Sequence, residues 1–490
     1  MAKNRVLFVA SEAAPLIKTG GLGDVSGSLP SALSELKQDV RIIMPAYRQV
    51  LTSLNDLSII ALIHLNDNCV VRILESTFPD TNLPLWLVDS PAHFDRNGGP
   101  YADQHGHDWP DNAERFTVFC KTIEHIALGS TDIDWQPDVV HCNDWQSGLI
   151  PALLSLHEKR PATVFTIHNL AYQGNYDYGT FEYLQHNFQV PTEFWTLHGM
   201  EFHGMFSFMK GGLMFSDMLN TVSPTYAKEI CTEAFGNGMD GLLQHRSDRL
   251  RGILNGIDYT QWNPKIDPFL EHHFDSKNLS GKQQNKLAVQ NKFNLPNKAD
   301  TPLIGMVGRL AEQKGVDLAL SVLPQLMDEH DVQVVLLGSG QKDYEAAYQE
   351  LASSYPYNFA ANIGFDEKLA HLIEAGSDMF LMPSRYEPCG LNQIYSLKYG
   401  AVPIVRHTGG LADTVVHADE STLKKKTASG FVFQDASHGA LYQALETALH
   451  YFENPKVWRQ IMQTGMSADF SWQRSAREYI NLYDVARQLQ

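Results

Sequence analysis

The chain has 490 residues, of which 43% are hydrophobic, and its 56 acidic and 38 basic side chains give a formal net charge of −18. One compact core rarely serves so long a chain, so we expect two large domains. The acidic balance argues against a nucleic-acid partner, and the lack of any run of about 18 apolar residues argues against a membrane partner.

The cysteines and the first residues bear on the cellular compartment. Five cysteines are scattered along the chain, at positions 69, 120, 142, 231 and 389. A scattered, odd number argues against a disulfide framework and favours a reducing compartment. Residues 1–5 lead directly into a predicted strand, without an apolar secretory segment. We therefore expect a cytoplasmic protein.

The first motif lies between a predicted strand, Val6–Ala10, and a predicted helix, Ser26–Leu36. It reads Lys18-Thr19-Gly20-Gly21-Leu22-Gly23-Asp24-Val25. Glycines let backbone N–H groups approach an anion closely, and a helix N-terminus adds partial positive charge. A lysine beside them supplies a full charge, so the motif indicates an anion site. The same glycines also fit an ordinary strand–helix turn.

Short apolar, β-branched runs alternate with helix-period segments along the whole chain. The further predicted strands are Arg41–Met44, Leu85–Val88, Asp138–His141, Thr163–Ile167, Met218–Val222, Gly252–Leu254, Leu303–Val307, Gln333–Leu337, Phe359–Gly364, Met379–Met382, Val402–Val405 and Gly430–Phe433. Predicted helices between them include Val316–Met327, Glu367–Gly376 and Gly390–Tyr399. This alternation predicts two doubly wound α/β domains with parallel sheets covered on both faces. Such sheets bind ligands at the carboxyl ends of their strands.

The join between the domains is predicted near Asn255-Gly256-Ile257-Asp258, a turn-rich stretch. Residues 262–300 carry little strand pattern and are interpreted as a linker with some helix. The expected domains are therefore 1–255 and 256–470. The tail, 471–490, is amphipathic.

Two cations follow the predicted strand Leu303–Val307. Gly308-Arg309-Leu310-Ala311-Glu312-Gln313-Lys314-Gly315 ends that strand and opens a helix. Arginine suits bidentate phosphate contacts, and lysine is a compact point charge. Cations are disfavoured at a helix N-terminus unless an anion is bound. Phosphate binding is therefore favoured over a solvated surface pair.

Two later motifs also follow predicted strands. Glu387, in Ser384-Arg385-Tyr386-Glu387-Pro388-Cys389-Gly390, is either an acid that stabilises a helix start or a carboxylate for sugar hydroxyls and oxocarbenium charge. Thr408-Gly409-Gly410-Leu411 is either a second anion nest or a plain tight turn.

Three patterns that can indicate metal or dinucleotide binding are set aside. Asp132-Ile133-Asp134 precedes a strand and looks like a turn, and His105-Gly106-His107-Asp108 lies in a loop without a matching ligand cluster. Gly338-Ser339-Gly340 lacks the third glycine of a dinucleotide fingerprint. No metal and no cofactor are therefore expected. A lone histidine after a strand, such as His168, is more often structural.

Taken in order, the motifs resemble those of bacterial glycogen synthases and plant starch synthases. The matching stretches are Lys18–Val25, Asp144-Trp145, Thr166-Ile167-His168-Asn169-Leu170, Asn255–Asp258, Gly308–Gly315, Glu387-Pro388-Cys389-Gly390-Leu391 and Thr408–Leu411. The resemblance implies the GT-B fold, with two Rossmann-like domains facing a deep cleft that closes for catalysis. It also implies retaining transfer of glucose from ADP-glucose to the non-reducing end of an α-1,4-glucan, glycogen or a maltooligosaccharide.

The same resemblance implies roles for individual residues. The expected catalytic residues are Lys18, His168, Arg309, Lys314 and Glu387. The expected substrate-binding residues are Lys18, Gly20, Gly21, Asp24, Asp144, Asn169, Asn255, Arg309, Lys314, Cys389, Gly390, Leu391, Thr408, Gly409 and Gly410. The N-terminal domain is expected to bind the acceptor, with the tail crossing back onto it, and the C-terminal domain to bind the nucleotide sugar. Two positions depart from common patterns: Asn143 stands where many relatives carry histidine, and Tyr395 stands where many GT-B enzymes carry a second glutamate.

Three alternative functions remain. One is a transferase of the same fold that uses UDP-glucose or another acceptor, because Arg309 and Lys314 would touch phosphates and not the base. Another is an inactive glucan-binding or regulatory protein, which the joint presence of Lys18, Arg309, Lys314 and Glu387 disfavours. The third, a nicotinamide-dependent dehydrogenase, is disfavoured by the missing glycine fingerprint.

Overall fold

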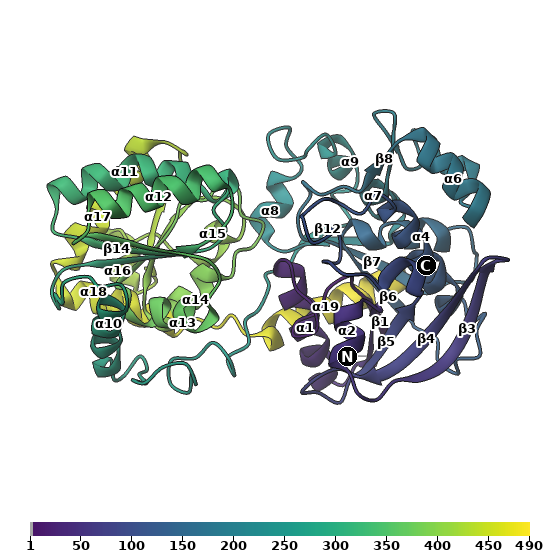
Figure 1. The fold of residues 1–490 in the computed structure, drawn as a ribbon, viewed down its shortest axis with the longest axis horizontal. Helices are drawn as coiled ribbons and strands as arrows, with labels where there is room; N and C mark the ends of the chain where they lie inside the picture. The colour runs from purple at the N-terminus through teal and green to yellow at the C-terminus, as the bar shows by residue number, and fades with distance from the viewer. Residues whose placement is uncertain (1–2) are drawn as a thin grey trace. The chain divides into compact units, whose positions relative to one another are not determined.

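The computed structural model describes residues 3–490, which form two compact units (Figure 1). Unit 1 extends to Gly256 and resumes at Trp472–Gln490, and unit 2 is Ile257–Ser471. Each unit is an α/β domain with its own sheet. The prediction of two doubly wound domains is confirmed.

Within residues 3–490, unit 1 contains a nine-stranded sheet in the order β12-β11-β7-β6-β1-β2-β5-β4-β3 and a three-stranded sheet in the order β8-β10-β9. Its strands are β1 Arg5–Val9, β2 Asp39–Pro45, β3 Ser58–Asn66, β4 Cys69–Thr77, β5 Pro84–Asp89, β6 Val139–Asn143, β7 Ala162–Ile167, β8 Asn175–Tyr176, β9 Glu201–Phe202, β10 Met205–Ser207, β11 Met218–Thr221 and β12 Leu250–Gly252. Its helices are α1 Gly21–Glu35, α2 Arg48–Ser53, α3 Pro91–Phe94, α4 Asn112–Ala127, α5 Leu149–Leu154, α6 Tyr178–Phe188, α7 Phe208–Phe215, α8 Pro224–Glu229, α9 Asp240–His245 and α19 Trp472–Gln488, with 3₁₀ turns η1 Trp145–Ser147 and η2 Thr192–Phe194.

One end of this sheet differs from the expectation. Strands β12 to β5 are parallel, but β4 pairs antiparallel with β5, and β3 pairs antiparallel with β4. Sequence analysis missed both strands. Their residues alternate between buried and exposed positions, as in Ala61, Leu62 and Ile63, because only one face of this hairpin is covered. Such alternation is a weaker signal than the continuous apolar runs of the central strands.

Unit 2 contains a six-stranded parallel sheet in the order β15-β14-β13-β16-β17-β18. Its strands are β13 Leu303–Val307, β14 Gln333–Gly338, β15 Phe359–Ile363, β16 Met379–Met382, β17 Val402–Arg406 and β18 Phe431–Phe433. Its helices are α10 Ser280–Lys292, α11 Val316–Glu329, α12 Lys342–Ser354, α13 Glu367–Gly376, α14 Asn392–Tyr399, α15 Gly409–Thr414, α16 Glu420–Lys425, α17 His438–Phe452 and α18 Pro455–Met466, with the 3₁₀ turn η3 Glu312–Lys314.

Both faces of the unit 2 sheet are buried. Successive side chains of each strand join different hydrophobic clusters, as Ile304 and Leu303 of β13 illustrate. Helices α11 and α12 cover one face, and α13 and α14 lie on the other (Figure 1). This two-sided burial explains why the unit 2 strands appear in the sequence as unbroken apolar runs.

The predicted boundaries are wrong at several ends. Helix α1 begins at Gly21 instead of Ser26. Glycine is a poor helix former, so the glycines in the first turn made the predicted start too late. Strand β12 ends at Gly252, where the predicted strand began, and α14 starts at Asn392, two residues after the predicted start. The shift of α14 leaves Gly390 and Leu391 in the turn that precedes it.

The last helix, α19, packs against α1 in unit 1 (Figure 1). A buried polar chain joins it to the sheet. Thr166 Oγ1 donates to Asn220 Oδ1 at 2.5 Å and therefore accepts from His141 Nε2 at 2.6 Å. His141 Nδ1 then accepts from the Tyr483 hydroxyl at 2.8 Å. Burial lowers the pKa of His141 to about 3, so the ring is neutral, as this pattern requires.

Tyr483→Phe should destabilise unit 1, because it leaves the buried Nδ1 of His141 without a donor. We expect the free energy of unfolding in urea to fall by about 1–3 kcal/mol. Tyr357→Phe is the matched control, since Tyr357 is 71% exposed, and its effect should stay within about 0.5 kcal/mol. Equal losses in the two variants would contradict this role for the hydroxyl of Tyr483.

Candidate active site

The Lys18–Val25 motif forms the turn between β1 and α1. Gly20 has an extended backbone and precedes the first helical residue, Gly21. Lys18 Nζ lies 2.6 Å from Asp24 Oδ1, so the predicted cation is paired with an acid of the same motif. Within residues 3–490, the N–H groups of Gly21 and Leu22 have no partner, as expected for the first turn of a helix. This end of α1 can therefore accept an anion.

Glu12 is a residue of this turn that sequence analysis missed. Its buried carboxylate accepts hydrogen bonds from Thr19 N at 2.5 Å, Thr19 Oγ1 at 2.6 Å, Gly20 N at 3.2 Å and the Tyr101 hydroxyl at 2.6 Å. The Thr19 and Gly20 amides are thus already bound to a carboxylate. One feature of the sequence could have identified Glu12: it is an acid three residues after the end of β1, and ligands bind at the carboxyl ends of strands in such sheets.

Asp144 follows β6 with a strained backbone. Its φ of 55° and ψ of 180° lie in a region that is nearly exclusive to glycine, and such strain concentrates at functional sites. Its Oδ1 accepts from His168 N at 2.7 Å. Burial raises the pKa of Asp144 to about 7, although N–H groups of His168 and Asn169 oppose the rise, and the charge of Glu12 adds to it.

His168 directly follows β7, the strand next to β6. Its ring is almost fully buried, and Nε2 lies 2.9 Å from Asn143 Oδ1. Burial lowers the pKa of His168 to about 3, so the ring is neutral near pH 7 and is not a general acid. Asn169 accepts from Ala171 N through its own side chain, in a local turn.

The predicted residues of unit 1 therefore gather mainly at one edge of its sheet. Strands β1, β6 and β7 are parallel neighbours, and their carboxyl ends carry Glu12, Asp144 and His168 respectively. Asn255 follows β12, two strands beyond β7. Its side chain is buried, and its Oδ1 has no hydrogen-bond partner within residues 3–490. An unpartnered buried acceptor of this kind suits a ligand contact.

The two predicted cations of unit 2 differ in their surroundings. Arg309 follows β13 and is exposed, and its guanidinium has no ion-pair or hydrogen-bond partner in the described chain. Lys314 ends η3, and its Nζ lies 2.6 Å from Oε2 of Glu387. Only Lys314 is therefore held by a protein carboxylate.

Glu387 is buried in the turn that follows β16. Ser384 Oγ donates to Glu387 Oε2 at 3.0 Å, so this oxygen has two donors. The N–H groups of Gly390 and Leu391, at the start of α14, have no partner within residues 3–490. A carboxylate, a cation and two open N–H groups thus share this turn region.

The Thr408–Leu411 turn follows β17, the strand paired with β16, and packs against the Glu387 turn. A Cβ atom at Gly409 would lie 1.9 Å from Glu387 O, and one at Gly410 would lie 2.0 Å from Cys389 O. Gly410 N donates to Glu387 O at 3.1 Å. These glycines are required for close backbone packing. The Gly410 amide is therefore occupied, which favours the tight-turn interpretation over a second anion nest at this position.

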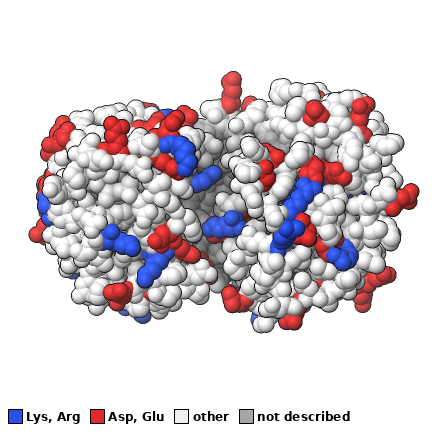
Figure 2. Space-filling model, in the orientation of Figure 1, with Lys and Arg blue, Asp and Glu red and all other residues white. Residues whose placement is uncertain are grey.

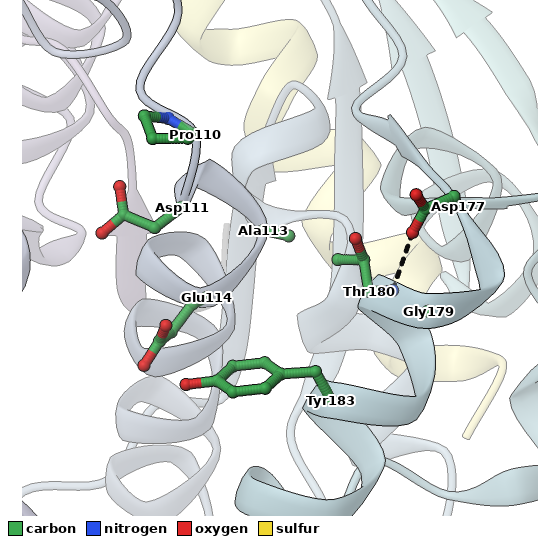
Figure 3. A pocket seen from close by; sticks show the side chains of 8 residues that line it. All are labelled: Pro110, Asp111, Ala113, Glu114, Asp177, Gly179, Thr180 and Tyr183. Carbon is green, nitrogen blue, oxygen red and sulfur yellow. Dashed lines mark hydrogen bonds between the residues drawn. The ribbon is translucent and has the colours of Figure 1, made fainter.

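In unit 2, all the predicted residues follow three adjacent strands. Arg309 and Lys314 follow β13, Glu387 to Leu391 follow β16, and Thr408 to Gly410 follow β17. A pocket elsewhere, in unit 1, is lined by α4 and α6 residues, with Glu114 and Tyr183 pointing toward each other (Figure 3). Of the predicted site residues, all of which are described by the structure, none lines it.

Charged side chains also occur outside these turns. Acidic side chains are scattered over the face of each unit that Figure 2 shows. In residues 3–490, one group of side chains, Glu329, His330 and Glu446, has metal-like spacing, and it lies at the end of α11 and on α17. No helix in that part of the chain is both long and apolar enough to span a membrane.

Two family models match the chain. The starch synthase catalytic domain matches residues 5–245, and glycosyl transferases group 1 matches residues 289–463. The chain is 51% identical to a glycogen synthase of Thioalkalivibrio sulfidiphilus, over 98% of this chain and 99% of that one. It is also 51% identical to glycogen synthase 2 of Nitrosococcus oceani, over 98% and 96% of the two chains.

Solved structures agree with these sequence matches. The catalytic domain of starch synthase IV from Arabidopsis thaliana, bound to ADP and acarbose, superposes with a TM-score of 0.87 at 32% identity, covering 99% of this chain and all of that one. A sucrose-phosphate synthase from Thermosynechococcus elongatus superposes with a TM-score of 0.58 at 17% identity, covering 98% of each chain. The second likeness concerns the fold alone.

Asp144→Asn should stabilise the protein more at pH 8 than at pH 5. The folded state raises the pKa of this carboxyl from 3.8 to about 7, so ionisation opposes folding increasingly as the pH rises through that interval. The asparagine cannot ionise, and it can still accept from His168 N. The gain has a ceiling of about 4 kcal/mol, at about 1.4 kcal/mol per pKa unit, and partial exposure lowers it. Thermal unfolding at the two pH values measures the gain, and an equal gain at both would contradict the raised pKa.

Proposed function

The chain belongs to the glycogen and starch synthase family, and from this membership we propose that it is a retaining glucosyltransferase of the GT-B fold. Its reaction moves glucose from ADP-glucose to the non-reducing end of an α-1,4-glucan. Full-length similarity to glycogen synthases supports the reaction. The ADP and acarbose of the plant structure support a nucleotide-sugar donor and a glucan acceptor.

The observation that carries the proposal is the 2.6 Å pair between Lys314 and Glu387. Loss of the sugar leaves negative charge on the diphosphate, and preorganised donors at that charge lower the barrier. Lys314, the exposed Arg309 and the open amides of Gly390 and Leu391 would provide them. Glu387 would then contact the sugar, where a carboxylate stabilises oxocarbenium charge.

The bond changes of the proposed reaction balance without a further reactant. The bond between the glucose C1 and the diphosphate oxygen breaks, and a bond from C1 to O4 of the acceptor forms on the same face. The acceptor hydroxyl proton passes to the departing diphosphate. The products are ADP and a glucan one glucose longer. In this scheme no side chain forms a covalent intermediate.

The remaining predicted residues are proposed to bind the two substrates. Unit 2 would hold ADP, and Lys18 in unit 1 would supply positive charge for an anionic substrate group. Asp144, His168 and Asn255 would contact the glucose or the acceptor. The neutral ring of His168 suits hydrogen bonding to a hydroxyl and not proton donation. The five cysteines are all free, which supports a reducing, cytoplasmic location.

ADP-glucose should be a far better donor than UDP-glucose for transfer of labelled glucose to glycogen. The expectation follows from similarity to bacterial glycogen synthases along 98% of the chain. The measurement is kcat/KM for each donor at a fixed glycogen concentration. Comparable values would remove the donor assignment and leave the fold and the glucan acceptor untouched.

Glu387→Ala should lower kcat by about 10²-fold or more, because the lost contact stabilises charge that develops in the transition state. Arg309→Ala and Lys314→Ala should also act mainly on kcat, since charge on the leaving group is greatest there. Lys342→Ala is a matched control: Lys342 is an exposed lysine of unit 2 that pairs only locally with Glu345. A kcat of Glu387→Ala close to that of the parent would show that this carboxylate only stabilises the start of a helix.

A further inference from the structure

Asn143, the last residue of β6, is fully buried beside His168, and its side-chain orientation is fixed. One side of its amide lies 2.9 Å from Val9 O and 3.4 Å from His141 O. Two carbonyl oxygens require a donor, so the NH₂ group faces them. The reversed orientation would place three acceptor oxygens together without a proton. Oδ1 therefore faces the other way.

This orientation determines where the proton of His168 lies. Oδ1 of Asn143 is 2.9 Å from His168 Nε2, and an amide oxygen only accepts hydrogen bonds. Nε2 must therefore carry the ring proton, which leaves Nδ1 with a free lone pair. Within residues 3–490, Nδ1 has no hydrogen-bond partner. The backbone N–H of His168 is held separately, by Asp144 Oδ1 at 2.7 Å.

The titratable groups around the ring are His141, Asp144 and Glu12. His141 is neutral and is engaged with Thr166 and Tyr483. Asp144 binds the backbone of His168, and Glu12 binds the turn before α1. None of the three accepts the Nε2 proton. Within the described chain, Asn143 is thus the side chain that selects the tautomer of His168.

We propose that Asn143 is a positioning residue that holds His168 as the Nε2–H tautomer and thereby presents Nδ1 as a hydrogen-bond acceptor for a substrate hydroxyl. The proposal rests on the glucosyltransferase function proposed above. His168 would touch substrate, whereas Asn143 acts through it. A donor tautomer or a charged ring at this position could not accept the hydroxyl proton in the hydrogen bond.

Asn143→Leu and Asn143→Asp change the ring in different ways. The leucine removes the acceptor, so the Nδ1–H tautomer becomes populated and kcat should fall about tenfold at every pH, the equivalent of about 1.4 kcal/mol. The aspartate keeps one oxygen toward Nε2, and its other oxygen replaces the NH₂ group that faces Val9 O and His141 O. Where this carboxyl ionises, its negative charge beside the ring raises the pKa of His168. Its kcat should therefore fall as the pH is lowered and recover at high pH.

Two readouts test the proposal together. Two-bond ¹H–¹⁵N correlation spectra report the tautomer of each histidine ring, with the His168 signals assigned from a His168→Gln variant. The pH dependence of kcat reports whether the ring must stay neutral. Asn220→Asp is the matched control: Asn220 is equally buried on β11 and hydrogen-bonds Thr166 and Tyr479 instead of His168. It should leave both readouts as in the parent.

The proposal is overturned if His168 keeps a single Nε2–H tautomer in Asn143→Leu, or if Asn143→Asp and Asn220→Asp show the same pH profile. Should the leucine variant not fold, the aspartate variant decides through its profile and its spectrum. A parent protein that transfers no glucose would refute the proposed function instead. The tautomer of His168 would still be read from the spectra in that case, so the two failures are distinguishable.

Discussion

The ion pair between Lys314 and Glu387 is the interaction on which the unit 2 site depends. Glu387 is buried, and a buried carboxylate without a compensating charge is strongly unfavourable. The surrounding backbone is shaped to make the 2.6 Å contact. Gly315, with φ of 65°, follows Lys314 and packs against Pro383, while Gly409 and Gly410 lie against the carbonyls of the Glu387 turn. A diphosphate bound at Lys314 would compete with Glu387, and so would release the carboxylate for the sugar.

Unit 1 handles buried negative charge differently. Glu12 and Asp144 lie at the ends of neighbouring strands and are stabilised by N–H and O–H donors, without a cation bound to either carboxylate among the described residues. The carboxylate of Glu12 accepts four hydrogen bonds, whereas Asp144 keeps a pKa of about 7 and a strained backbone. Unfavourable charge and strain at the same residue are expected where function outweighs stability. In unit 2 the buried carboxylate is therefore balanced by a cation, whereas in unit 1 the two buried carboxylates depend on hydrogen-bond donors.

Much of the fold could be predicted, because parallel strands buried on both faces appear as continuous apolar runs; Leu303–Val307 and Met379–Met382 were placed with their observed bounds. The half-exposed hairpin β3–β4 could not be predicted, because with one covered face its residues only alternate between buried and exposed positions. Among site residues, Arg309, Lys314 and Glu387 were predicted to follow strands, and the structure shows that these strands are neighbours in the sheet. Nothing local revealed that Glu12 folds back onto Thr19, or that the amide of Gly410 is used by Glu387 O. Such contacts depend on segments that only the tertiary structure brings together.

The competition between Glu387 and a diphosphate for Lys314 is tested most directly by titrating ADP into the parent and into Glu387→Gln in a calorimeter. The glutamine is close in size but uncharged, so it releases Lys314 from its ion pair. ADP should then bind Glu387→Gln at least as tightly as the parent, although glucose transfer is lost. Lys314→Met should weaken ADP binding in the same experiment. Loss of ADP binding in Glu387→Gln as large as that in Lys314→Met would contradict the competition and show that the pair acts only to hold the turn together.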